Sequence, residues 1–171
     1  MRIVAVSGGS YKSFYINCFL KLKKCDLLIF NFGIIYNYVV EDELLKSAIV
    51  TKELLQLASK LNATVVAGVF VVSKKRRQKS IIVCDGDKIE IQPANKGVLV
   101  CLKKCQFFVG DESANCLRYN KIVLSGKRIR PKIEHCSPKK CYVFCDNYGT
   151  TFVQNGKFER KFNKYSKIIL K

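Results

Sequence analysis

An apolar run that ends on acidic residues is the first place in this chain where chemistry could be expected. Residues 107–113 read FFVGDES, so an apolar segment stops at Gly110 and is followed directly by Asp111 and Glu112. A buried strand that opens onto polar groups at its tip is a common location for catalytic or binding residues in α/β proteins. The segment therefore predicts either a site at the end of a strand or a simple turn.

The nine cysteines are the second group of reactive side chains. In the segment HCSPKKCYVFC, Cys136, Cys141 and Cys145 are separated by four and then three residues. Structural zinc sites are typically marked by paired C-x2-C knuckles, which this segment lacks. Cys141 and Cys145 also fall on one face of an alternating strand pattern. We therefore expect buried thiols rather than metal ligands, and we expect no cofactor.

Other catalytic patterns are weak. His135 is the single histidine, which argues against histidine-based acid–base catalysis and against a multi-histidine metal site. The stretch SGGS at residues 7–10 has neither a Walker pattern nor a full G-x-G-x-x-G, so we interpret it as a strand-to-helix turn. The chain contains no G-x-S-x-G motif, and a serine triad would depend on His135 alone.

The charge balance is strongly basic. The chain has 31 Lys and Arg against 13 Asp and Glu, a formal net charge of +18. Residues 74–79, 127–132 and 157–167 form basic tracts that could neutralise phosphates, and aromatic residues interleave the last one. No motif of a nucleic-acid-binding family accompanies them, and basic residues occur along the whole chain. We favour solvated lysine-rich faces, with a nucleic acid as the alternative partner.

The compartment follows from the N-terminus and the cysteines. MRIVAVSGGSYK has no long apolar core after its basic residue, so it does not resemble a signal peptide. The longest apolar region, LLIFNFGIIYNYVV, is interrupted by Asn31, Gly33 and Asn37, which indicates core rather than a membrane span. We expect a reduced, cytoplasmic protein without a membrane partner, forming one domain over residues 1–171.

The elements that would position these residues alternate helix and strand at first and are mostly β afterwards. Two helices are predicted, over residues 10–25 and from Asp42 to Leu61, the second with apolar residues repeating at three and four. Residues 113–120 are expected to form at most one or two helical turns. A continuous apolar run at residues 25–33 predicts a strand covered on both faces. The other predicted strands cover residues 1–8, 63–72, 80–91, 97–102, 105–110, 121–126, 141–147 and 150–162. A hairpin tip is predicted at residues 73–79, and a tight turn at the Asp85-Gly86 pair inside residues 80–91.

In this order, the elements resemble those of the nitrilase, or carbon–nitrogen hydrolase, superfamily. RIVAVSG is similar to the family's first strand, and CDLLIFNFG to a second strand that normally reads D-L-V-V-F-P-E. QKSIIVCDGDKI resembles a hairpin written Y-N-S-x6-G-x-I, and KKCQFFVGDE resembles the strand bearing G-V-x-I-C-Y-D. CYVFCDNYGTTFVQNGKF resembles the end of the domain, Y-V-V-x-A-N-x-x-G. The resemblance implies an α-β-β-α sandwich with mixed sheets, shortened by about 90 residues relative to the expected domain size.

The resemblance also implies a catalytic set of Glu, Lys and Cys, which this chain does not reproduce. The glutamate position falls at Phe32, the lysine position near Ala94 or Lys96, and the cysteine position at Gly110. Phenylalanine cannot accept a proton and glycine supplies no thiolate, so the covalent chemistry is expected to be absent.

Binding residues and a replacement nucleophile can still be named. Asp111, Glu112 and Lys96 are the candidate binding residues, and Cys116 with Glu112 is the candidate for a relocated catalytic pair. We therefore expect a non-catalytic binding or assembly protein. Members of the family often pair through helices into dimers, so the resemblance implies a homodimer here. The alternatives are an amide or nitrile hydrolase with a relocated nucleophile, and a basic nucleic-acid-binding module. The sequence identifies no small-molecule ligand.

Overall fold

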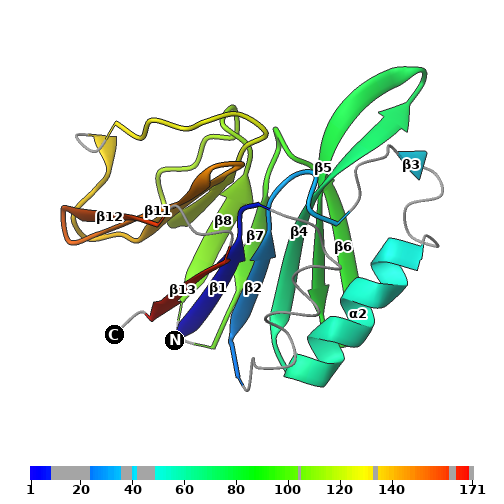
Figure 1. Cartoon of the computed structure of the whole chain (residues 1–171), viewed down its shortest axis with the longest axis horizontal. Helices are drawn as coiled ribbons and strands as arrows, with labels where there is room; N and C mark the ends of the chain where they lie inside the picture. The colour runs from blue at the N-terminus through cyan, green and yellow to red at the C-terminus, as the bar shows by residue number, and fades with distance from the viewer. Residues whose placement is uncertain are drawn as a thin grey trace.

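Two β-sheets, each mixing parallel and antiparallel strands, lie face to face in the computed structural model (Figure 1). The structure describes residues 1–8, 24–35, 40–41, 49–103, 105–132, 135–161 and 165–169. The first sheet contains β1 (Arg2–Val6), β2 (Leu27–Phe30), β3 (Val40–Glu41), β4 (Thr64–Ser73), β5 (Arg76–Asp85), β6 (Lys88–Pro93) and β13 (Tyr165–Ile169). The second sheet contains β7 (Val98–Cys101), β8 (Gln106–Gly110), β9 (Asn120–Leu124), β10 (Tyr142–Asp146), β11 (Gly149–Gln154) and β12 (Lys157–Lys161).

The centre of the first sheet is parallel and buried on both faces. β2 runs parallel to β1 on one side and to β4 on the other, and all four residues of β2 are buried. A strand covered on both faces needs no polar alternation, which explains its continuous apolar run. The prediction of a doubly covered strand over residues 25–33 is confirmed.

One described helix, α2 (Ile49–Leu61), covers the outer face of the first sheet. Leu54, Leu57 and Ala58 lie on one side of this helix and pack against the sheet. The helix ends at Asn62, whose φ of 48° is the left-handed conformation that commonly terminates helices. The predicted stop is therefore confirmed, whereas residues 42–48 and most of the predicted helix at 10–25 lie outside the described residues.

The space between the sheets holds the second core. Ile3, Ile29 and Val66 of the first sheet face Val109 and Ile122 of the second, and all five are buried. Alternate residues of the strands in the second sheet point into this core. Buried positions therefore alternate with more exposed ones along β7 and over the first four residues of β8. The predicted sandwich of two mixed sheets is confirmed.

The outer face of the second sheet differs from the α-β-β-α expectation. In the described part of the chain, irregular segments lie on this face instead of a helix. The Lys121 ammonium donates to the Ala114 carbonyl at 2.7 Å, and the Tyr142 hydroxyl accepts from the Ser137 amide at 2.9 Å. The helical turns suggested for residues 113–120 are absent, because residues 114–119 are bends and coil. Polar turn residues here bond locally rather than continuing a helix.

Two strands were not predicted. β13 pairs antiparallel with β1, which brings the end of the chain alongside its beginning (Figure 1). β3 pairs parallel with the far half of β4, at Val71 and Val72. The C-terminal basic tract at residues 157–167 is consequently divided between β12 and β13, which belong to different sheets.

Candidate functional site

An asparagine joins the two sheets at the end where β2 and β9 finish. Asn31 follows β2 directly, and Ser125 follows β9 directly; both are fully buried. The Asn31 side chain donates to the Ser125 carbonyl at 2.8 Å and accepts from the Ser125 amide at 3.0 Å. It also donates to the Asn147 side chain at 3.0 Å. These bonds satisfy polar groups that would otherwise be buried without partners. This end of the sandwich is called the mouth below.

Phe32, which the sequence resemblance matches with the family's glutamate, lies buried at the mouth. Its side chain is 2% exposed, and its ring centroid lies 5.4 Å from that of Phe70. A Cβ atom on Gly68 would lie 2.8 Å from the Phe32 ring, so the ring uses the space that a side chain at position 68 would need. The Lys79 ammonium lies 5.2 Å from the ring centroid, within the range of a cation–π interaction.

Gly110 is equally enclosed. A Cβ atom at this position would overlap the Ala114 methyl group and would lie 3.3 Å from the Ala94 carbonyl oxygen. The Asp111 amide donates to that same carbonyl at 3.0 Å, which holds the end of β8 against Ala94. A side chain at position 110 would therefore require the backbone or Ala114 to move.

The two acidic candidates have different roles. Asp111 is buried, and one of its oxygens accepts from the Ser113 amide at 2.9 Å and from the Ser113 hydroxyl at 2.6 Å. This is an Asx turn, in which the carboxylate stabilises its own loop. Glu112 faces outward: one oxygen lies 3.2 Å from the Lys79 ammonium, and the other accepts from the Ser125 hydroxyl. The opening segment is thus a turn with one outward carboxylate.

The fold brings the Lys79 ammonium to the side chains of Phe32 and Glu112 at the mouth. The sequence resemblance points to Ala94 or Lys96 as the lysine position. Ala94 is fully buried, whereas Lys96 is exposed on the turn that follows β6. Lys79 belongs to β5 and is paired in register with Phe70. Sequence reasoning placed Lys79 in a basic tract and missed Asn31, Ser125 and Ala114. Polar residues that directly follow buried strands were the available signal for Asn31 and Ser125.

Cys116, the candidate for a relocated nucleophile, is half-buried in the segment that covers the outer face of the second sheet. Lys121 is close to this segment, since it donates to the Ala114 carbonyl. Burial lowers the pKa of the Lys121 ammonium, and the negative charges of Cys116 and Asp111 act in the opposite direction. Cys116 and Asp111 therefore lie close enough to Lys121 to act on its charge.

The core cysteines behave as buried thiols. Burial raises the pKa of Cys145 to about 12, and the pKa of Cys141 is also raised to about 12 by burial. Such thiols remain protonated at neutral pH and are poor nucleophiles. Among the residues that the structure describes, no three His, Cys, Asp or Glu side chains gather as metal ligands would. No helix among the described residues has the length and apolar character needed to span a membrane.

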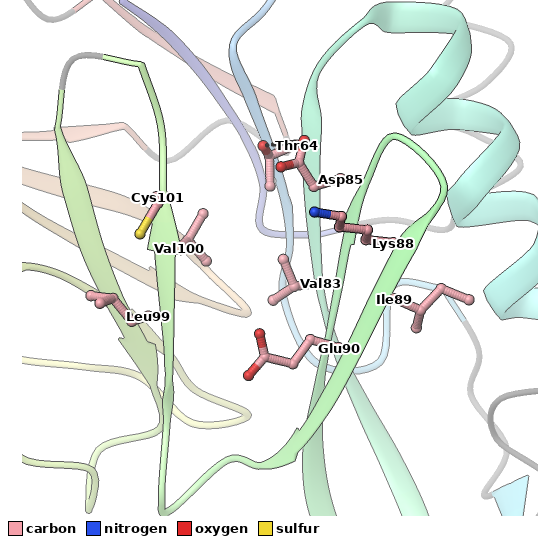
Figure 2. Close-up of a pocket in the computed structure, with 9 residues that line it drawn as sticks. All are labelled: Thr64, Val83, Asp85, Lys88, Ile89, Glu90, Leu99, Val100 and Cys101. Atoms are coloured by element: carbon pink, nitrogen blue, oxygen red, sulfur yellow. Dashed lines mark hydrogen bonds between the residues drawn. The ribbon is translucent and has the colours of Figure 1, made fainter.

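A groove of about 540 Å³ opens elsewhere, between the edge strands β6 and β7 (Figure 2). Val83 and Val100 are its apolar residues nearest the core, and Glu90 shares the face of Val83 because the two residues are paired in register. At one end, the Thr64 hydroxyl donates to the Asp85 carboxylate at 3.3 Å. This groove begins where β4 begins, so it lies toward the end opposite the mouth.

Solved structures with similar folds give these positions a context. The chain superposes on a CN-hydrolase superfamily protein from Xanthomonas campestris with a TM-score of 0.66 and 10% identity, over 98% of this chain and 89% of that one. An amidase from Nesterenkonia sp. superposes with a TM-score of 0.67 and 9% identity, over 99% of this chain and 90% of the amidase. Saccharomyces cerevisiae Nit3, a member of branch 10 of the nitrilase superfamily, gives 0.67 and 14% identity, over 98% and 89%.

The sequence comparisons add no closer match. No protein-family model matches the chain, and no curated protein does so either. At identities between 8% and 14%, the structural likeness concerns the fold. The element order, the two mixed sheets and the near-complete coverage agree with the resemblance found in the sequence. The chain therefore has the fold of the nitrilase superfamily.

Proposed function

We propose that this chain is a non-hydrolytic protein of nitrilase fold, whose role is to bind or assemble rather than to cleave carbon–nitrogen bonds. The observation that carries the proposal is the enclosure of Gly110. At the position where the fold's relatives would place a nucleophile, the Ala114 methyl group occupies the space of a side chain. Nucleophilic catalysis requires an activated side chain with room for a substrate carbon next to it, and neither is available at Gly110.

The surroundings of Gly110 support the same proposal. Phe32 places an aromatic ring where a proton-accepting carboxylate would be needed, and this ring is held by Gly68 and Phe70. The outward carboxylate of Glu112 is occupied by Lys79 and Ser125. These interactions engage the outward carboxylate of Glu112 and place an aromatic ring where a general base would be needed.

The test is a turnover assay with the purified chain on a broad panel of amides and nitriles. We expect no hydrolysis above the rate of the buffer alone. A matched pair of variants separates the alternatives, because Cys116→Ala removes the relocated nucleophile and Cys101→Ala removes an exposed thiol elsewhere. Turnover that disappears in Cys116→Ala but persists in Cys101→Ala would contradict the proposal and establish a relocated nucleophile.

A further inference from the structure

Two basic tracts that are far apart in the sequence meet at the mouth. Phe70 connects them, because the Arg77 guanidinium carbon lies 4.3 Å from the centre of its ring and a Cβ atom on Gly126 would lie 3.8 Å from the same ring. Gly126 directly precedes the second tract. The basic strip, as we name it, consists of the exposed residues Lys74, Lys75, Arg76, Arg77, Lys127, Arg128 and Arg130.

The first part of the basic strip is a projecting hairpin. β4 and β5 each have ten residues, and their tip extends beyond the neighbouring strands (Figure 1). Lys74 and Lys75 form the two-residue turn, with φ values of 48° and 62°. Such turns favour Asn and Gly, because left-handed backbone is strained for other residues. Two lysines at this turn place charge at the tip despite that strain.

The second part of the basic strip ends at an exposed aromatic ring. Tyr148 is 60% exposed, and the Arg128 guanidinium carbon lies 5.9 Å from the centre of its ring. The Tyr148 amide donates to the Asp146 carboxylate at 2.8 Å, which fixes the turn that carries the ring. An exposed ring beside a guanidinium, carried on a turn held by this bond, is a suitable surface for stacking a nucleobase.

Two of the described acidic residues at this end, Asp146 and Glu112, are already paired with cations. The Asp146 carboxylate is buried and lies 2.7 Å from the Arg160 guanidinium. The Glu112 carboxylate is paired with Lys79 at 3.2 Å. Each of these carboxylates therefore has a cationic partner of its own, and the strip keeps its positive charge.

We propose that the basic strip binds the phosphate backbone of a single-stranded nucleic acid, with Tyr148 stacking on a base. This proposal names a partner for the non-hydrolytic role and rests on it. A nucleic acid fits better than an anionic membrane, because membrane binding requires a large exposed apolar surface. Among the described residues beside the strip, Tyr148 is the large exposed side chain of this kind. The sequence favoured solvated lysine faces because it could not show that the two tracts meet.

The main experiment measures fluorescence anisotropy of a labelled single-stranded oligonucleotide of about 16 nucleotides. We expect binding that weakens steeply between about 50 and 300 mM salt. The double variant Arg77→Gln/Arg128→Gln should bind on the order of tenfold more weakly, and its salt slope should be shallower by about 1.4, or about 0.7 for each lost phosphate contact.

The matched control removes the same amount of charge elsewhere. Lys24 and Lys88 are exposed and lie near the starts of β2 and β6, at the end opposite the mouth. Lys24→Gln/Lys88→Gln should retain the affinity and salt slope of the unmodified chain. If this control weakens binding as much as the strip variant does, the charge acts non-specifically and the strip is not the site.

The tyrosine provides a second, independent readout. Tyr148→Ala should weaken binding about fivefold or more with little change in salt slope, whereas Tyr148→Phe should retain binding because it keeps the aromatic face. Equal loss in both variants would overturn the stacking contact.

Two further outcomes would overturn the proposal as a whole: no oligonucleotide binding at low salt, or binding to phosphatidylserine vesicles without binding to the oligonucleotide. Failure here leaves the turnover assay unaffected, so loss of the strip proposal and loss of the non-hydrolytic role are distinguishable.

Discussion

The mouth and the groove between β6 and β7 are opposite in character. At the mouth, Phe32 is 2% exposed, and Ala114 occupies the space beside Gly110. At the groove, two charged residues of the edge strand β6, Lys88 and Glu90, line a cavity of about 540 Å³. Side chains therefore fill the space around Phe32 and Gly110, while an open cavity lies between the sheet edges.

The difference teaches that a sheet sandwich can close one end with side chains alone. Closure at the mouth depends on an aromatic ring against glycine and on a methyl group against glycine. Each is a close-packed contact, and small changes of volume in such contacts are costly. Several side chains that line the groove, among them Leu99, Lys88 and Glu90, are exposed, so substitutions of these residues should have much smaller effects.

The largest expected effect is at Phe32. Phe32→Ala should lower the free energy of unfolding by about 3–5 kcal/mol, because it removes a buried ring and leaves a cavity next to Gly68. Urea denaturation followed by circular dichroism measures the change. A loss below about 1 kcal/mol would mean that the mouth is not closely packed.

A smaller but more specific effect is expected at Gly110. Gly110→Ala should cost about 1–3 kcal/mol, because the new methyl group overlaps that of Ala114. Adding Ala114→Gly to the same chain should recover most of the loss. A double-mutant cycle measures this coupling, and simple additivity of the two changes would contradict the described contact.

The pH dependence of stability should differ between a buried and an exposed cysteine. Cys145 has a pKa raised from 9.0 to about 12 by burial, whereas Cys101 is exposed in the groove. Between pH 9.0 and about pH 12, the unfolded chain loses the Cys145 proton, whereas the folded chain keeps it. This thiol should therefore lower stability by about 1.4 kcal/mol per pH unit in that range, and contribute no such loss below pH 9.

Urea denaturation at several alkaline pH values checks the thiol prediction. The slope of stability against pH should become shallower in Cys145→Ala and should be unchanged in Cys101→Ala. Identical slopes in all three proteins would show that Cys145 is not shielded from solvent.

The smallest effect is expected in the groove itself. Leu99 is 37% exposed on the edge strand β7 and lines the cavity. Leu99→Ala should change the free energy of unfolding by no more than about 0.5 kcal/mol, as is usual for exposed positions. A loss comparable to that of Phe32→Ala would mean that the groove is closed in solution and that the contrast with the mouth is wrong.

Much of the fold could be predicted because local patterns determine it. The doubly buried β2 follows from its apolar run, the helix stop before Asn62 from apolar spacing and a left-handed residue, and the hairpin tip at residues 73–79 from the polar segment between two apolar runs. The pairing of β13 with β1 joins residues about as far apart as the chain allows. A long-range pairing of this kind leaves no signal in a local window, which explains why it was missed.

The candidate site was harder to predict than the fold. Phe32 and Gly110 were found through the resemblance, and the structure places both beside other side chains that fill the mouth. The contacts of Glu112 with Lys79 and Ser125 involve both sheets. No spacing rule connects residues on separate sheets, so only the three-dimensional arrangement reveals them.

Asn31 has a consequence for how the molecule can move. Its amide pairs with Ser125 in the way that one peptide group pairs with another across a ladder, giving and receiving one bond each. Layered proteins often admit ligands by sliding one layer over another. Here such a shear would break both bonds between buried groups, so this pair opposes sliding of the two sheets at this end.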